Sequence, residues 1–398
     1  MLYCFSATAF KTLQDVHIDL GSINVFVGAN GSGKSNILEA VGLLGAAASG
    51  RVNDESLMHR GVRPGLPVLY KSSFRGVRGA QHIRLEAKTS KAQYLVSLWN
   101  PISEPSPDWK YKHESLHSGS RLVISRSPRS AGKWNDNAGL AALKAVDLLP
   151  DDPAGILLNT LKNYAIYSPD TPTLRGLEPD AQSREPVGLA GGRLPEGWQS
   201  MLLGDPRKSA TIEMRRKSLS GMLSVVDWLS SVTVVNSSEL PIAASIPQPR
   251  RGLRFRDKFM GEGRNVLSGY DASEGVLYLL YYSVLALHPS SPKFFAVDNF
   301  DQALNPRTAR EFTREFCTWI MADESRQVLL TTHNPLVLDG LPLQDDRVRL
   351  FAVERSKQGK TSVRRVVMDE VLLSAAQKGT PLSQAWVNGH FGGVPPNV

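Results

Sequence analysis

The sequence predicts an α/β fold built around a parallel sheet. This prediction rests on three short segments that are expected to form strands. Residues 23–27, 294–297 and 327–332 are continuous apolar or β-branched runs. A run of this length and composition is typical of a strand that is buried on both faces. Each run ends in glycine or polar residues, which is where a ligand site forms in such sheets.

Length and composition place the chain among ordinary globular proteins. Its 398 residues allow one large α/β domain with an insertion, or two modest domains. Hydrophobic residues make up 41% and charged residues 21%. The net charge of +8 is a mild basic excess, which permits contact with nucleic acid without demonstrating it.

Compartment is inferred from cysteine use and from apolar runs. Cys4 and Cys317 are the only cysteines, they lie far apart, and they lack metal-type spacing, so we expect a reducing compartment without disulfides. The first residues carry no secretory signal pattern, and the longest apolar run, 275–287, is too short to span a bilayer. We therefore expect a cytoplasmic protein without a membrane partner.

The strongest motif follows the strand at 23–27. It is a complete G-x-x-x-x-G-K-S loop, followed by an apolar helical run over 36–44, and it consists of Gly28, Ala29, Asn30, Gly31, Ser32, Gly33, Lys34 and Ser35. The glycines let backbone N–H groups turn toward phosphates at a helix N-terminus. Lys34 is expected to reach the β- and γ-phosphates and Ser35 to ligate Mg²⁺. The order strand, loop, helix disfavours a chance glycine turn.

Two further groups are predicted to complete this site. Asp298 ends the strand at 294–297, where a carboxylate that organises Mg²⁺ belongs. His333 follows the strand at 327–332 and a Thr-Thr pair. A lone histidine is commonly a surface or core residue, but its place at a strand tip favours a functional role.

At this point the sequence resembles the ABC-type ATPases of the RecF, SMC and OLD group. The resemblance is carried by residues 28–36, 298–305 and 331–333, and by blocks at 10–16 and 382–389 near the two ends. About half the chain is matched. It implies an ABC-type P-loop ATPase head that binds ATP and Mg²⁺, with Asn36 included in the nucleotide-binding stretch.

The resemblance also requires a signature serine and glycine at the start of a helix. Ser273 and Gly275 precede an apolar helical run and are the preferred candidates, while Ser268 followed by Gly269 is the alternative. An ordinary serine N-cap would give the same pattern. In this family the signature of one subunit closes on the nucleotide of another, which implies a head-to-tail homo-oligomer, at least a dimer.

One catalytic position departs from the family pattern. Asn299 stands where the family usually has a glutamate that polarises the attacking water, and Asn305 stands where an aspartate is common. An amide cannot accept a proton, and loss of a general base typically costs on the order of 10²–10⁴ in rate. Slow hydrolysis is therefore expected. The alternatives are that Asn299 is a tolerated variant, or that another group such as Asp301 serves as the base.

The organisation predicted is an N-terminal ATPase lobe (1–100), a mixed α+β insertion (101–263) and a C-terminal ATPase lobe (264–398). Within and around the insertion, alternation predicts strands at 82–87 and 94–99. Residues 101–137 read as a loop, and helices are predicted at 139–149, 152–164 and 214–232. No heptad pattern is long enough for a coiled-coil arm.

Two observations bear on partners. Basic clusters at 215–217 and 250–258 permit phosphate contact, with Arg254, Arg256 and Lys258 spaced to share one side of a strand, but a solvated edge explains them equally well. No nuclease constellation appears after His333, where residues 345–353 and 361–368 read as two final strands.

These observations lead to one functional hypothesis and an alternative. The first is an ATP-binding subunit that controls a separate effector, such as a nuclease, and resembles the stand-alone ATPase subunits of anti-phage defence systems (Septu-like, PARIS-like or retron-associated). The alternative is a RecF-like repair ATPase acting directly on DNA. The early N-terminal strand and the unusual signature disfavour the energising subunit of a transporter.

Overall fold

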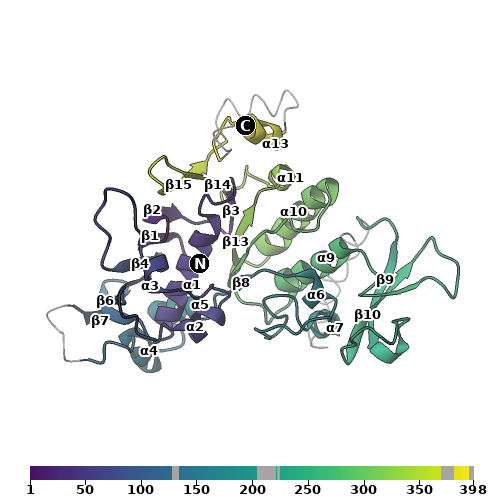
Figure 1. Ribbon diagram of the computed structural model, residues 1–398, viewed down its shortest axis with the longest axis horizontal. Coiled ribbons are helices and arrows are strands. Elements are labelled where there is room, and N and C mark those ends of the chain that lie inside the picture. The colour runs from purple at the N-terminus through teal and green to yellow at the C-terminus, as the bar shows by residue number, and fades with distance from the viewer. Residues whose placement is uncertain (128–133, 204–220, 222–224, 369–380, 394–398) are drawn as a thin grey trace.

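A computed structural model describes residues 1–127, 134–203, 221, 225–368 and 381–393 of the chain. Two six-stranded sheets and one three-stranded sheet form its framework. Figure 1 shows the N-terminal strands gathered on one side, α9, β9 and β10 on the other, and β3 and β13 between them. The predicted α/β class is confirmed. The boundaries at residues 100 and 263 stay a prediction.

The first sheet is antiparallel and carries the N-terminal hairpin at one edge. Its strand order is β2-β1-β4-β5-β6-β7. The strands are β1 (Cys4–Phe10), β2 (Leu13–Asp19), β4 (Ile83–Lys88), β5 (Ala92–Trp99), β6 (Lys110–Ser118) and β7 (Arg121–Arg126). Alternate positions face inward and pack on α1 (Lys34–Ala48), forming one of two hydrophobic cores.

The predicted loop over 101–137 is wrong, because β6 and β7 lie within it. Two features hide β6 from a pattern search. The register between β5 and β6 shifts at Ser97 and Leu98, which breaks the two-residue period. In addition, one of the inward positions of β6 is the carboxylate Glu114, which is fully buried.

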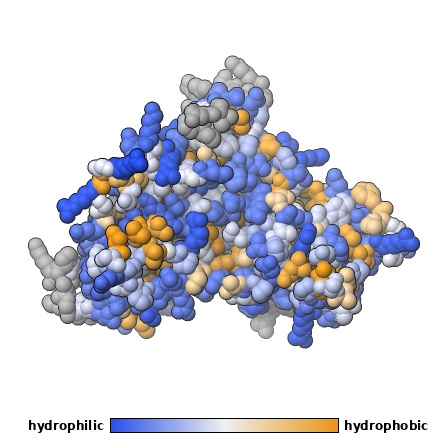
Figure 2. All heavy atoms as spheres, in the orientation of Figure 1, coloured by the Kyte–Doolittle hydropathy of each residue, from blue (hydrophilic) through white to orange (hydrophobic). Residues whose placement is uncertain are grey.

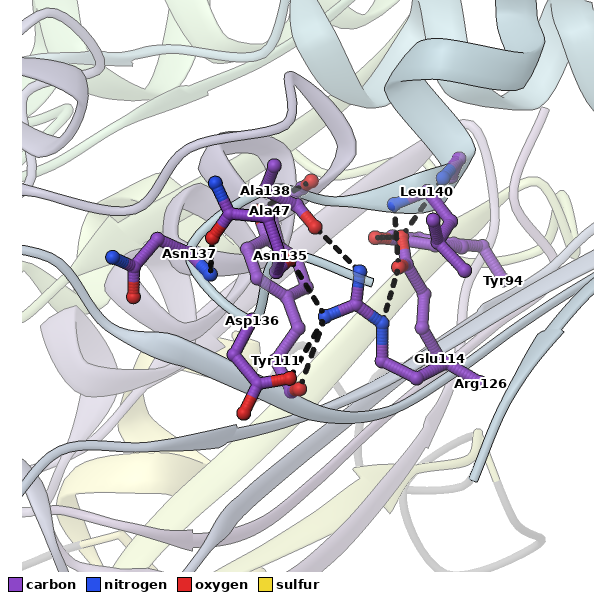
Figure 3. A network of polar contacts seen from close by, with 11 residues as sticks. Ala47, Tyr94, Tyr111, Glu114, Arg126, Asn135, Asp136, Asn137, Ala138 and Leu140 are labelled. Atoms are coloured by element: carbon purple, nitrogen blue, oxygen red, sulfur yellow. Dashed lines mark hydrogen bonds and ion pairs between the residues drawn. The ribbon is translucent and has the colours of Figure 1, made fainter. Parts of the chain in front are cut away.

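Glu114 is the centre of a buried polar network, shown in Figure 3. Its carboxylate accepts the backbone N–H groups of Leu140 at 2.7 Å and Ala141 at 3.0 Å, and the Tyr94 hydroxyl at 3.0 Å. Arg126 lies 4.0 Å from it and donates to carbonyl oxygens, including that of Ala138 at 2.6 Å. The network therefore fastens the start of α4 (Leu140–Lys144) to β5, β6 and β7.

The second sheet is mainly parallel and holds the three strands that predicted the fold. Its order is β15-β14-β3-β13-β12-β8. The strands are β3 (Ile23–Val27), β8 (Ile166–Tyr167), β12 (Phe294–Val297), β13 (Gln327–Thr332), β14 (Val348–Arg355) and β15 (Thr361–Val366). Helices α9 (Glu274–Leu287) and α10 (Pro306–Met321) belong to the second hydrophobic core. The two predicted final strands correspond to β14 and β15.

A three-stranded sheet of order β11-β10-β9 extends from this core. It consists of β9 (Leu229–Asn236), β10 (Arg251–Asp257) and β11 (Val266–Ser268). The predicted helix at 214–232 is wrong at its end, because residues 229–232 belong to β9; residues 214–220 and 222–224 lie outside the described part. The β-branched run at 232–235, which begins at that end, favours a strand.

Short helices fill the remaining connections. The predicted helix at 152–164 is α5 (Pro153–Lys162), capped by Asp152, whereas the one at 139–149 is divided into α4 and η2 (Ala145–Asp147). The others are α2 (Asp54–Met58), α3 (Pro67–Tyr70), α6 (Thr171–Leu174), α7 (Leu194–Leu203), η4 (Ser237–Glu239), α11 (Pro335–Leu338) and α13 (Leu382–Val387). Among the described helices none combines the length and apolar character needed to cross a lipid bilayer.

The face shown in Figure 2 is largely hydrophilic, with a few groups of apolar residues on it. Of the predicted basic clusters, residues 215–217 lie outside the described part. Arg254 and Arg256 lie on β10, two positions apart and therefore on one side, while Lys258 follows the end of the strand.

Candidate functional site

The phosphate loop joins β3 directly to α1. Gly31 and Gly33 have positive φ angles of 76° and 110°, conformations that glycine adopts without steric cost. Gly33 is also the N-cap of α1, so the loop ends at a helix N-terminus. Backbone N–H groups at a helix N-terminus can bind an anion, which is the role that the sequence predicts for this loop.

Two neighbouring strands close around the loop and require its glycines. A Cβ atom at Gly28 would lie 2.2 Å from the Val353 carbonyl oxygen, and one at Gly33 would lie 2.2 Å from the Thr361 hydroxyl. Thr361 donates to the Ser32 carbonyl at 2.8 Å. Sequence reasoning missed Thr361, because nothing local marks a residue that meets the loop only through sheet pairing.

Asn36 and Thr12 extend this contact. The Asn36 amide donates to the Thr12 hydroxyl at 2.7 Å, and the same hydroxyl lies 2.7 Å from that of Thr361. Thr12 is in the turn between β1 and β2, so the first sheet touches the phosphate loop at this point. Asn36 thus has a clear positioning role beside the loop.

Lys34 lies over the loop. Its ammonium group donates to the carbonyl oxygens of Gly28 at 2.7 Å and Ala29 at 3.1 Å, and the residue is 7% exposed. Burial lowers the pKa of Lys34, and the carboxylates of Asp298 and Asp301 offset part of this effect. A cation held in this way is well placed to move onto a phosphate, which would replace the carbonyl contacts.

Ser35 and Asp298 meet at the carboxyl ends of β3 and β12. The Ser35 hydroxyl donates to Asp298 Oδ2 at 2.9 Å, and the Thr331 hydroxyl donates to Oδ1 at 2.5 Å. Thr331 belongs to β13, which lies between the other two strands in the sheet. A hydroxyl and a carboxylate in contact form the oxygen-rich pair that Mg²⁺ prefers.

Asn299 has a left-handed backbone conformation with φ 57°. Its N–H donates to the Thr331 hydroxyl at 2.9 Å, and the N–H of Phe300 donates to the Thr331 carbonyl at 3.0 Å. Asparagine tolerates this conformation better than most non-glycine residues. The amide is therefore suited to the backbone at a position where family members usually carry glutamate.

The residues around His333 fix its turn but leave its side chain exposed. The Thr332 hydroxyl donates to Asp301 at 2.7 Å and accepts the N–H of Asn334 at 3.0 Å. Asn334 in turn caps α11. Asp301 Oδ1 is therefore engaged as an acceptor at the strand tip.

The two signature candidates differ in accessibility. Ser273 is the N-cap of α9, is exposed, and makes no side-chain cap hydrogen bond. Ser268 is fully buried, and its hydroxyl donates to Asp271 at 2.6 Å. A Cβ atom at Gly275 would lie 2.9 Å from the Ala303 carbonyl oxygen, so α9 packs closely on the segment after Asp298. Accessibility favours Ser273.

Asn305 has a structural explanation. It is the N-cap of α10, and its side chain accepts the N–H of Thr308 at 3.0 Å. Asparagine and aspartate are nearly equivalent in this role. The difference from the family pattern at this position therefore leaves the local structure intact.

The residues present fit ATP and Mg²⁺. The Ser32 hydroxyl is buried and has no hydrogen-bond partner within the described residues, although it lies in a loop of phosphate-binding type. The glycine turns leave room for close approach of a phosphate, with Lys34 on one side. Ser35 and Asp298 would hold the metal, which when bound would neutralise charge on the phosphate oxygens.

Comparison with known proteins agrees with this geometry. Residues 23–339, which include the phosphate loop, Asp298 and His333, match the family model described as "AAA domain, putative AbiEii toxin, Type IV TA system". The chain belongs to this AAA family. Membership implies nucleotide binding, generally with Mg²⁺.

Relatives of this AAA chain are distant. The "DNA replication and repair protein RecF" of Renibacterium salmoninarum is 36% identical over 104 residues, which is 24% of this chain and 24% of that protein. The match thus spans about a quarter of the relative's length.

Solved structures support the fold of the AAA chain. An Smc head bound to the C-winged helix domain of ScpA matches with a TM-score of 0.53 and 13% identity, over 93% of this chain and 99% of that one. The SMC head of Thermotoga maritima matches with a TM-score of 0.43 and 14% identity, over 92% and 98%. The first likeness supports a head-type ATPase fold.

Proposed function

We propose that this chain is an ATP-binding switch subunit that assembles head-to-tail around ATP and hydrolyses it slowly. The observation that carries the proposal is the pair Asp298 and Asn299. Asp298 contacts Ser35 and so supports a metal site, while the next residue is a neutral amide rather than a carboxylate. The chain therefore has groups that can bind ATP and Mg²⁺, but an amide replaces the carboxylate that usually accepts a proton from the attacking water.

Each group of residues would have its own role in binding ATP and Mg²⁺. Backbone N–H groups of the loop and Lys34 hold the phosphates, while Ser35 and Asp298 hold Mg²⁺. Asn299 and His333 lie at the ends of neighbouring strands, where they would contact the γ-phosphate or a water beside it. The amide of Asn299 can orient that water, but it cannot take its proton. Bound ATP would then hold the two subunits together.

Assembly depends on the signature segment. The exposed Ser273 hydroxyl and the first N–H groups of α9 have the chemistry to contact the γ-phosphate of a nucleotide held by a second copy. One phosphate-loop face and one signature face on each chain give a closed head-to-tail dimer with two nucleotides.

A separate effector follows from the chemistry that the sequence lacks. The chain shows no nuclease constellation, and its family description names a toxin system. These two points support an ATPase subunit that controls another protein, such as a nuclease, in anti-phage defence. The conformational change would be loss of γ-phosphate contacts at the subunit interface.

A second function, direct action on DNA, is supported by one surface feature. The ammonium groups of Lys110 and Lys112 lie 5.7 and 5.3 Å from the centre of the half-buried Trp99 ring, and Lys112 is also paired with Asp136 at 3.0 Å. Two lysines beside a partly exposed aromatic ring can contact nucleic-acid phosphates. The partial match to RecF points in the same direction.

Light scattering and phosphate release distinguish the two functions. The switch predicts that ATP, but not ADP, converts monomers to dimers, with little phosphate released and no effect of added DNA. The repair function predicts phosphate release that DNA stimulates. If ATP produced no dimer at saturating concentration, the switch proposal would be wrong.

A further inference from the structure

The exposed face of the N-terminal hairpin brings together three metal-ligating side chains. Cys4 is on β1, and His17 and Asp19 are on β2. Cys4 pairs with Asp19 in the antiparallel register, and Ser6 pairs with His17. Because side chains two positions apart share a face of a strand, all of these groups point to the same side of the sheet.

We infer that Cys4, His17 and Asp19 form a binding site for one transition-metal ion of the Zn²⁺ class. Their ligand atoms all lie within 4.8 Å of one another. Thiolate, imidazole and carboxylate together suit Zn²⁺, whereas Mg²⁺ prefers oxygen ligands. This site is thus chemically distinct from the Ser35 and Asp298 pair in the nucleotide site.

The distances match those of tetrahedral coordination. The Cys4 sulfur lies 3.5 Å from His17 Nε2, and Nε2 lies 3.5 Å from Asp19 Oδ1. With Zn–S of about 2.3 Å and Zn–N or Zn–O of about 2.0–2.1 Å, tetrahedral angles give about 3.5 Å between sulfur and nitrogen and about 3.4 Å between nitrogen and oxygen. Because the Cys4 sulfur also lies 3.6 Å from His17 Nδ1, the exposed imidazole ring has to turn before Nε2 can face an ion held by Cys4.

The three side chains differ in how freely they can move. Cys4 is 2% exposed and therefore fixed, whereas the side chains of His17 and Asp19 are 62% and 64% exposed and can turn to close on an ion. The Ser6 hydroxyl lies 2.9 Å from His17 Nδ1. A hydrogen bond there would orient the ring and leave Nε2 for the metal.

The metal would fasten the edge of the first sheet. β2 is the edge strand, and it is paired with β1. The opposite end of the same hairpin carries Thr12, which contacts Asn36 beside the phosphate loop. Three protein ligands leave a fourth position for water or an exogenous ligand. Occupancy should raise thermal stability, since the ion binds the folded hairpin only.

Cobalt spectroscopy on the full, chelator-treated chain tests the site. We expect Co²⁺ to bind at one equivalent in the absence of nucleotide, with a sulfur-to-cobalt charge-transfer band that Zn²⁺ removes. Cys4→Ser should abolish the band, while Cys317→Ser, the matched control at the fully buried second cysteine, should retain it. Asp19→Asn, at an exposed side chain, should weaken Co²⁺ binding by about tenfold or more.

The outcomes separate this site from the nucleotide site. Ser35→Ala should leave the cobalt band unchanged, and Zn²⁺ should raise the melting temperature of the wild type but not of Asp19→Asn. The proposal is overturned if no charge-transfer band appears, or if the band persists in Cys4→Ser. Equal Co²⁺ affinity in wild type and Asp19→Asn would exclude Asp19 as a ligand.

Discussion

The Ser35 hydroxyl donates a hydrogen bond to the Asp298 carboxylate at 2.9 Å, although 263 positions separate the two residues in the sequence. The contact exists because β3 and β12 end at the same edge of one parallel sheet, with β13 and Thr331 between them. The two oxygen groups expected to hold Mg²⁺ are therefore adjacent in the fold.

Removing the Asp298 carboxylate should remove the benefit of Mg²⁺. Asp298→Asn keeps the size of the side chain but removes its charge. We expect the factor by which Mg²⁺ increases ATP affinity to be at least about tenfold smaller in this variant than in the wild type. Calorimetry with and without a chelator measures this. Asp323→Asn, at a carboxylate that lies between α10 and β13 and is paired with Lys293, is the control. An undiminished Mg²⁺ effect in Asp298→Asn would exclude Asp298 as a ligand.

Changing Ser273 should affect assembly but leave nucleotide binding by one chain intact. Ser273→Arg places a long charged side chain at the N-terminus of α9, where it opposes both packing and the helix dipole. We expect ATP-dependent dimers to disappear in light scattering while ATP affinity stays as in the wild type. Because the Ser268 hydroxyl is bonded to Asp271, Ser268→Ala tests folding instead. Loss of dimers in a Ser268→Ala protein that stays folded and binds ATP, with dimers kept in Ser273→Arg, would favour the other signature.

Glu114 should control the stability of the N-terminal sheet. Glu114→Ala leaves the N–H groups of Leu140 and Ala141 without acceptors and Arg126 with a buried charge, at a cost of about 3–5 kcal/mol. Denaturant unfolding measures this change in the free energy of unfolding. Glu86→Gln, at a partly covered β4 carboxylate paired with Lys88 on the opposite face from the core, is the control and should change stability by no more than about 1 kcal/mol. A cost near zero for Glu114→Ala would contradict the network.

The same residue gives a pH dependence. Burial raises the pKa of Glu114, with the backbone hydrogen bonds from Ala141 and Leu140 opposing this effect. The folded chain therefore binds this proton more tightly than the unfolded chain, so the contribution is fully present at low pH and is lost as pH rises through the folded pKa. The stability of wild type relative to Glu114→Gln should therefore fall as the pH rises above the ordinary glutamate pKa of about 4.3. A rise would mean that the pKa is lowered.

Local pattern was enough to predict the parallel sheet and the phosphate loop. Apolar runs mark β3, β12 and β13, and the motif at 28–35 lies where a strand meets a helix. Local pattern failed for β6, where a register shift and the inward Glu114 disturb the alternation. Inward polar groups that are satisfied by distant backbone leave no signal in a short window.

Contacts between strands could not be predicted from one sequence. Thr12 and Thr361 meet the phosphate loop only because sheet pairing brings them there. Cys4 showed no metal-type spacing along the chain, yet the β1–β2 register places it beside His17. In both cases the contact depends on which strands pair with each other, and a single sequence does not show that pairing.

The central claim, that the Asn299 amide limits turnover, is tested by comparing Asn299→Glu with Asn299→Gln. Both variants share side-chain length and a left-handed strain of about 1–2 kcal/mol, so they differ only in the carboxylate. Phosphate release is measured under single-turnover conditions at saturating ATP and Mg²⁺. We expect Asn299→Glu to exceed both wild type and Asn299→Gln by about 10²-fold or more. Equal rates in the three proteins, or rapid hydrolysis by the wild type, would contradict the account.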